Sequence, residues 1–311
     1  MLLRAVFALA ASASLSLAAS LQQVTSFGEN PTKIQMYIYV PAKLAEKPPV
    51  VVAVRFPKTV FTLRVVRLIQ TQMHGCMASA SGFYAQTKLP SYADKYGFIL
   101  IYPSTPNQNN CWDVQNPATL THGGAGDAKG IISMINYTLD KYKGDAAKVF
   151  VLGSSSGAMM TNVMVATYPE VFEAGAAYSG VAHACFAGAA GATPMSPNQT
   201  CAQGLQHTPQ EWAQFVRNSY PSYTGKRPRM QIWHGYADTL VRPQCAFEAL
   251  KQWSAVLGLQ NTKNNTGVPS SAYTQLVYGD GTQLMGFFGQ GVGHVAPVNE
   301  EHMLKFFGIM T

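Results

Sequence analysis

The chain has 311 residues, of which 47% are hydrophobic and only 12% are charged, and its formal net charge is +7. Leaving out Arg4 and the four basic residues within residues 55–73 lowers this charge to +2. The rest of the chain therefore lacks the basic excess of nucleic-acid-binding proteins, and that class is excluded.

The first twenty residues predict a secretory signal peptide. Arg4 gives the positive start, residues 5–17 form an apolar stretch too short to span a membrane, and Ala19 and Ser20 are small residues suited to cleavage. No later stretch is long and charge-free enough to span one. We expect an exported, soluble protein without a membrane partner. Residues 21–311 should form a single monomeric domain with no carbohydrate-binding module.

Predicted strands and helices alternate along this domain. The pattern indicates a mainly parallel central sheet with helices on both faces, an α/β fold. The predicted strands are residues 36–40, 50–54, 97–102 (ended by Pro103), 148–152, 176–180, 230–233 and 273–278, taken as the last. The predicted helices are residues 127–142, 158–167, 209–219 (after a capping box at Thr208), 245–256 and a C-terminal helix with His302.

The stretch Gly153-Ser154-Ser155-Ser156-Gly157 lies between a predicted strand and a predicted helix. G-x-S-x-G in this setting is typical of a nucleophile elbow, a turn so tight that glycine is favoured on both sides. Its central residue, Ser155, is the candidate nucleophile, against the simpler interpretation of a Ser/Gly-rich turn. The helix N-terminus beneath it offers unpaired N–H groups to a developing oxyanion.

The order nucleophile, acid, histidine then selects the other candidates. Only Asp238 and Asp280 follow Ser155 as aspartates, and Asp238 lies just past the end of a predicted strand, whereas Asp280 lies in an ordinary turn. His294 follows a glycine-rich loop that can bend toward Ser155. We predict that His294 removes the proton of Ser155 and that Asp238 orients His294. Asp238 could instead cap the following segment.

Other histidines fit the role of base less well. His302 is interpreted as a surface residue, His183 and His207 precede the acid, and His234 is interpreted as structural. For the oxyanion hole, the backbone N–H groups of Ser156 and Cys76 are the candidates. Gly75 before Cys76 would let that backbone approach the substrate.

The chain has five cysteines, so at least one stays unpaired, and the predicted export predicts disulfides among the others. Cys185 and Cys201 bracket a small loop that a bridge would close, Cys76 and Cys111 would then pair, and Cys245 would stay free. No cysteine or histidine cluster has the spacing of a metal site. Of the three sequons, those at Asn198 and Asn264 lie in polar loop sequence and are candidate glycosylation sites, and that at Asn136 falls in a predicted helix.

Four segments together resemble the fungal acetylxylan esterases of carbohydrate esterase family one, relatives of feruloyl esterases and polyhydroxybutyrate depolymerases. They are YGFILIYPSTPNQNNCWD, KVFVLGSSSGAMMTNVMVATYPEVFEAGAAYSG, RPRMQIWHGYADTLV and GQGVGHVAP. The resemblance implies an α/β-hydrolase fold and the removal of O-acetyl groups from xylan through an acetyl-Ser155 intermediate. It implies no cofactor. Acetylated xylan or a related plant cell-wall polysaccharide is the implied substrate.

Residues 55–73 depart from this family. In the family the strand at residues 50–54 runs directly into the loop that begins at His74, whereas here nineteen residues with four bases and no acid intervene. We interpret them as a retained in-frame intron, with a genuine inserted lid as the alternative.

Three other functions stay open. A feruloyl esterase would use the same scaffold with a longer, aromatic-lined acyl pocket. A polyester or lipid esterase would need a more apolar wall around the site. A catalytically impaired carbohydrate-binding protein is conceivable if residues 55–73 displace the oxyanion loop.

Overall fold

A computed structural model describes residues 19–54, 79–107, 110–187 and 198–310. Residues 55–73 and Cys76 therefore lie outside the described residues. Of the predicted signal peptide, only residues 19 and 20 are described. In the part that is described, no helix is long and apolar enough to cross a lipid bilayer.

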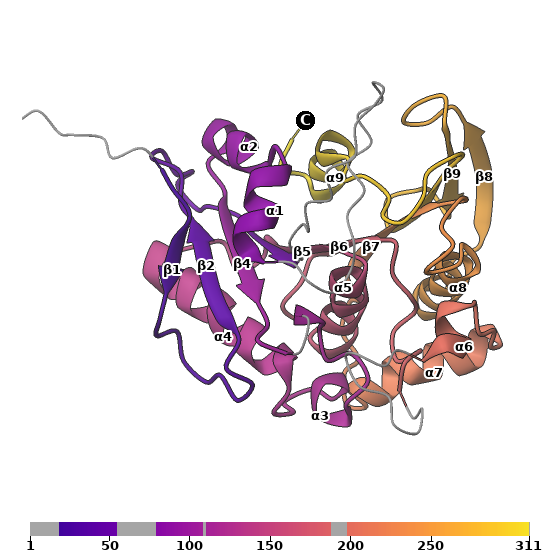
Figure 1. Cartoon of the computed structure of the whole chain (residues 1–311), viewed down its shortest axis with the longest axis horizontal. Helices are drawn as coiled ribbons and strands as arrows, with labels where there is room; N and C mark the ends of the chain where they lie inside the picture. Colours follow the sequence, from indigo (N-terminus) through magenta and orange to yellow (C-terminus); the bar gives the residue numbers. More distant parts are fainter. Residues whose placement is uncertain (1–18, 55–78, 108–109, 188–197, 311) are drawn as a thin grey trace, which may run out of the picture.

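The described strands form one ten-stranded sheet in the order β1-β2-β4-β3-β5-β6-β7-β10-β9-β8 (Figure 1). Its central strands, from β4 to β10, are parallel, and antiparallel strands extend it at both sides. The strands are β1 (Gln22–Val24), β2 (Gln35–Tyr39), β3 (Val50–Val54), β4 (Ile99–Ser104), β5 (Val149–Ser154), β6 (Ala174–Tyr178), β7 (Arg229–Gly235), β8 (Asn261–Thr266), β9 (Tyr273–Tyr278) and β10 (Leu284–Gly289).

Helices cover both faces of the sheet, as predicted (Figure 1). One hydrophobic cluster joins the sheet to α4, α5, α7 and α8, and a second joins the opposite face to α1, α2 and α9. The helices are α1 (Ala80–Gln86), α2 (Leu89–Tyr96), α3 (Pro117–Leu120), α4 (Asp127–Tyr142), α5 (Ser156–Thr167), α6 (Gln199–Ala202), α7 (Pro209–Ser219), α8 (Gln244–Leu257) and α9 (Glu300–Phe307). This is the α/β-hydrolase fold.

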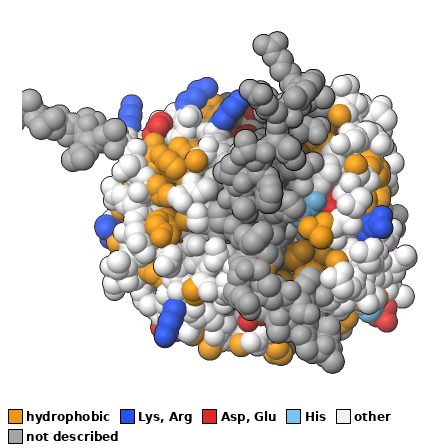
Figure 2. Space-filling view, viewed as in Figure 1, with side chains coloured by type: hydrophobic (Ala, Val, Ile, Leu, Met, Phe, Trp, Pro, Cys, Tyr) orange, Lys and Arg blue, Asp and Glu red, His pale blue; other side chains and the backbone are white. Residues whose placement is uncertain are grey.

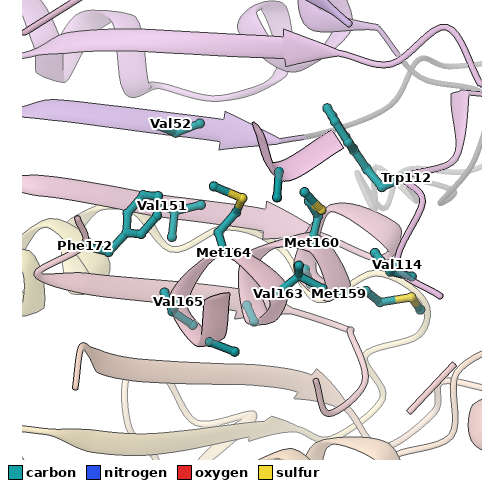
Figure 3. Close-up of a cluster of buried hydrophobic side chains, with 14 of the residues drawn as sticks. Val52, Trp112, Val114, Val151, Met159, Met160, Val163, Met164, Val165 and Phe172 are labelled. Atoms are coloured by element: carbon teal, nitrogen blue, oxygen red, sulfur yellow. The ribbon is translucent and has the colours of Figure 1, made fainter. Parts of the chain in front are cut away.

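Helix α5 lies against the centre of the sheet, and every one of its residues is buried. Its methionine and valine side chains pack around Val52 of β3 and Val151 of β5 (Figure 3). Such complete burial fixes the N-terminus of α5, which directly follows Ser155, against the sheet. The candidate nucleophile is therefore mounted on a rigid part of the core.

Three predictions about strands need correction. The segment Tyr273–Tyr278 is a strand but not the last one, because β10 follows it and lies between it and the parallel core. Strand β8 was not predicted at all. The strand ending at Pro103 was also cut short: β4 continues to Ser104, because β3 pairs only with its first half and Pro103 faces the antiparallel neighbour β2.

Candidate active site

Ser155 lies in a strained turn between β5 and α5. Its φ of 55° and ψ of −123° place it outside the ordinary regions for a residue with a side chain, at a cost of about 1–3 kcal/mol. Gly153 makes the turn possible, since a Cβ there would lie 2.2 Å from the carbonyl oxygen of Gly157. The backbone N–H of Ser155 donates to the carbonyl of Tyr178 on β6, which holds the turn onto the sheet.

The structure brings the three predicted residues into one hydrogen-bonded row. The Oγ of Ser155 lies 2.8 Å from Nε2 of His294, and Nδ1 of His294 lies 2.7 Å from Oδ2 of Asp238. A carboxylate only accepts, so Nδ1 carries a hydrogen and Nε2 is left free to accept from the Ser155 hydroxyl. The three residues follow β5, β7 and β10, whose carboxyl ends meet at one edge of the sheet.

Asp238 is buried, and burial alone would raise the pKa of its carboxyl. Hydrogen bonds from His234 and His294 outweigh that penalty and hold the pKa of Asp238 well below its usual range. The other carboxylate oxygen, Oδ1, accepts from the backbone N–H groups of Leu240 and Val241. Asp238 is therefore ionised at neutral pH and held in one orientation.

The loop that carries His294 is fixed on both sides of the histidine. On its N-terminal side, the carbonyl of Val292 accepts from the N–H of Ala237, and a Cβ on Gly235 would lie 2.0 Å from that carbonyl oxygen. On its C-terminal side, the N–H of Ala296 donates to Oγ of Ser179. Sequence reasoning missed Gly235 and Ser179. Their signal was only their position at the ends of strands β7 and β6.

Part of the candidate oxyanion hole can be described. As the first residue of α5, Ser156 has no helical carbonyl to which its N–H could donate. Its Oγ accepts from the backbone N–H of Trp112, which lies beyond the strand ends near the start of α5 (Figure 3). Cys76, the second predicted donor, lies outside the described residues.

Three of the rejected candidates lie away from the triad, and one contacts it. Asp280 is in an exposed turn, where its side chain accepts from Thr282. His302 is half-buried in α9, edge-on to Phe287. His183 is in the core and contacts Ser219. His234, however, contacts Asp238 directly.

The cysteines in the described residues match the predicted pattern. Cys185 and Cys201 form a disulfide, and Cys245 is a free, buried thiol. Cys111 is disulfide-bonded, while its predicted partner Cys76 lies outside the described residues. The bridge ties α6 to Cys185, and the carbonyl of Cys201 in α6 in turn accepts from the thiol of Cys245 on α8.

His183 makes the fold sensitive to acid. Burial, with the charge of Arg227, lowers the pKa of His183 to about 3, against 6.5 in an unfolded chain. Its stabilising contribution is complete above pH 6.5 and is lost as the pH falls toward 3, by at most about 1.4 kcal/mol per pH unit. We expect the difference in free energy of unfolding between the protein and His183→Gln, measured with urea, to shrink between pH 7 and pH 4.

The comparison with the variant is needed because Asp127 acts in the opposite sense. Burial raises the pKa of Asp127 to about 6, so this carboxyl binds a proton more tightly in the folded protein and favours folding in acid. A difference between protein and variant that stays constant from pH 7 to pH 4 would contradict the role given to His183.

A mainly parallel sheet with a serine on a strand-to-helix turn, followed in the chain by an aspartate and a histidine at other strand ends, defines the α/β-hydrolase class. The family model described as esterase PHB depolymerase matches residues 51–267. The chain therefore belongs to this family, and it is a carboxylic ester hydrolase.

Relatives in two groups resemble the chain over nearly its whole length. Feruloyl esterase B of Neurospora crassa is 64% identical, and the match covers 100% of both chains. Acetylxylan esterase A of Aspergillus ficuum is 43% identical over 93% of this chain and 89% of that relative. The solved structure of acetyl xylan esterase from Aspergillus awamori superposes with a TM-score of 0.84 at 43% identity, covering 93% of this chain and 99% of the other.

Proposed function

We propose that this protein is a secreted serine esterase that removes O-acetyl groups from acetylated xylan, and that Ser155, His294 and Asp238 are its catalytic triad. The observation that carries the proposal is the unbroken row of hydrogen bonds from Ser155 through His294 to Asp238. The similarity to acetylxylan esterases of known sequence and structure supports the substrate.

In the proposed reaction each residue takes one step. Nε2 of His294 takes the proton as Oγ of Ser155 attacks the acetyl carbonyl, and the N–H groups of Ser156 and Cys76 bind the resulting oxyanion. His294 then passes the proton to the departing sugar oxygen, which leaves acetyl-Ser155. Water repeats the sequence and releases acetate, while Asp238 stabilises the imidazolium in both halves.

Feruloyl ester hydrolysis is the second candidate, favoured by one observation. The relatives with 64% and 60% identity over the full chain are both feruloyl esterases B. The two activities share every step above and differ only in the acyl group that the pocket accepts. Hence the triad itself does not distinguish them.

Export is supported by the Cys185–Cys201 disulfide and by the two sequons predicted to carry glycans. Asn264 is exposed on the edge strand β8, and Asn198 caps α6 with its Oδ1. Figure 2 shows a face with few and scattered charged side chains, which suits contact with a neutral polysaccharide.

Acetate release from acetylated xylan, with ferulate release from feruloylated arabinoxylan measured alongside, tests the proposal. We expect acetate release by the full chain, by a variant lacking residues 55–73, or by both. Activity in the shortened variant alone would support the retained intron, and equal activity would support a tolerated lid. Ferulate release without acetate release would select the second candidate, and no release of either acid would contradict both.

A further inference from the structure

A second histidine lies against the acid of the proposed triad. His234 is on β7, four residues before Asp238, and its side chain is fully buried. Its Nε2 lies 2.8 Å from the carbonyl oxygen of Val241 and 3.2 Å from Oδ2 of Asp238. Oδ2 of Asp238 therefore has an imidazole nitrogen on two sides, one from His234 and one from His294.

The carbonyl of Val241 determines which nitrogen of His234 carries the hydrogen. A carbonyl oxygen only accepts, so Nε2 of His234 must donate. The same N–H reaches Oδ2 of Asp238 as the weaker branch of a shared hydrogen bond. Nδ1 of His234 is buried and has no hydrogen-bond partner among the described residues, which fits a ring whose single hydrogen is on Nε2.

The contacts of His234 close a small ring of hydrogen bonds. Val241 donates its N–H to Oδ1 of Asp238 and accepts from His234 with its carbonyl. Leu240 adds a second N–H to Oδ1. Because His234 contributes the only side chain in this ring besides Asp238 itself, it ties the turn at residues 238–241 to the end of the sheet.

We propose that His234 is a positioning residue of the triad, which holds Oδ2 of Asp238 in line with His294 and takes up part of the negative charge of that oxygen. The proposal rests on the proposed function. Its chemical consequence is on His294: an Asp238 relieved of part of its charge attracts the imidazolium less strongly. His234 therefore sets both the orientation of the Asp238 carboxylate and the strength with which that carboxylate attracts the imidazolium of His294.

A titratable group on another element also faces Asp238. Besides His234 and His294, Cys245 of α8 interacts with it electrostatically. Burial, together with the charge of Asp238, raises the pKa of Cys245 to about 12, so this thiol is neutral wherever the enzyme would work. A change in the pH profile after substitution of His234 would thus report on Asp238 and His294.

Two substitutions distinguish the effect of losing the hydrogen-bond donor of His234 from the effect of changing the volume of its side chain. His234→Met fills the space without a donor, whereas His234→Gln places an amide N–H near the position of Nε2. We expect His234→Met to lower kcat on the hydrolysed ester about ten- to a hundredfold with KM changed less than about twofold. We expect the acid limb of the kcat/KM profile of His234→Met to move to higher pH. In this variant the full negative charge on Asp238 stabilises the imidazolium of His294, which therefore loses its proton at a higher pH. His234→Gln should recover most of kcat and the original limb.

The control is His207→Gln, a half-buried histidine that packs on Trp212 and Phe215, with expected kcat and pH profile unchanged. Equal loss of kcat in both His234 variants with an unmoved acid limb would overturn the proposal and leave His234 a purely structural residue.

A readout without turnover is the low-field NMR signal of the Nδ1 proton shared by His294 and Asp238. We expect it to shift in His234→Met and not in His234→Gln, and an identical signal in all forms would also overturn it. A wild-type protein without esterase activity would contradict the proposed function, whereas the NMR signal would still test the positioning role of His234.

Discussion

Ser155→Ala is expected to abolish ester hydrolysis, with kcat falling about 10⁵- to 10⁶-fold, as removal of the nucleophile does in other serine hydrolases. The loss follows because Oγ forms the only covalent bond to the substrate. The fold should persist, since Oγ contacts only His294 among the described hydrogen bonds and alanine fits the same turn. Acetate release, labelling by a fluorophosphonate probe and thermal unfolding would measure the three effects.

The matched control for this variant is Ser154→Ala, the neighbouring serine, whose buried Oγ has no hydrogen-bond partner in the part of the chain that the structure describes. It should keep the label and most of the activity. A Ser155→Ala protein that retains more than about one per cent of the activity, or a fluorophosphonate label found on a different serine, would show that the nucleophile is wrongly assigned.

Asp238→Asn should lower kcat by about four orders of magnitude, the effect of the analogous change in a serine protease. The new amide can donate a hydrogen to Nδ1 of His294, which turns the ring into the tautomer with its hydrogen on Nε2. That nitrogen then cannot accept the proton of Ser155. Steady-state kinetics on a soluble acetyl ester would measure the loss.

Asp280→Asn is the comparison that isolates the effect of Asp238. Asp280 is exposed, and its side chain accepts from the backbone N–H and the hydroxyl of Thr282 on its own turn. Its substitution should change kcat less than about twofold. The reverse result, with Asp280→Asn inactive and Asp238→Asn active, would mean that the acid lies at the other position and that the geometry seen here is not the working one.

The three triad candidates were predictable because each obeys a local rule. Gly153 and Ser155 form a turn whose shape dictates its residues, and Asp238 and His294 follow it in the order that the fold imposes. Helix α4 was predicted with its observed bounds, since its apolar residues recur at helical spacing over sixteen positions. Where the local sequence pattern is this strong, contacts with the rest of the chain do not change the local structure.

Other parts of the structure depend on partners that no short stretch reveals. Strand β8 has the sequence NTKNNT, with no apolar residue to indicate a strand, and it forms because β9 offers a free edge. Strand β10 was not predicted, although it is largely apolar and buried. The contact between His234 and Asp238 could not be predicted either, because it exists only after the turn at residues 238–241 has closed.

The wide spacing of the triad along the chain has a consequence for how the enzyme matures. Ser155 and His294 are 139 residues apart in sequence and meet only when β10 has joined β7. A molecule in which β10 has not paired with β7 therefore lacks the proposed triad. The number of serines that react with a fluorophosphonate probe in a sample should then count the molecules whose sheet is complete.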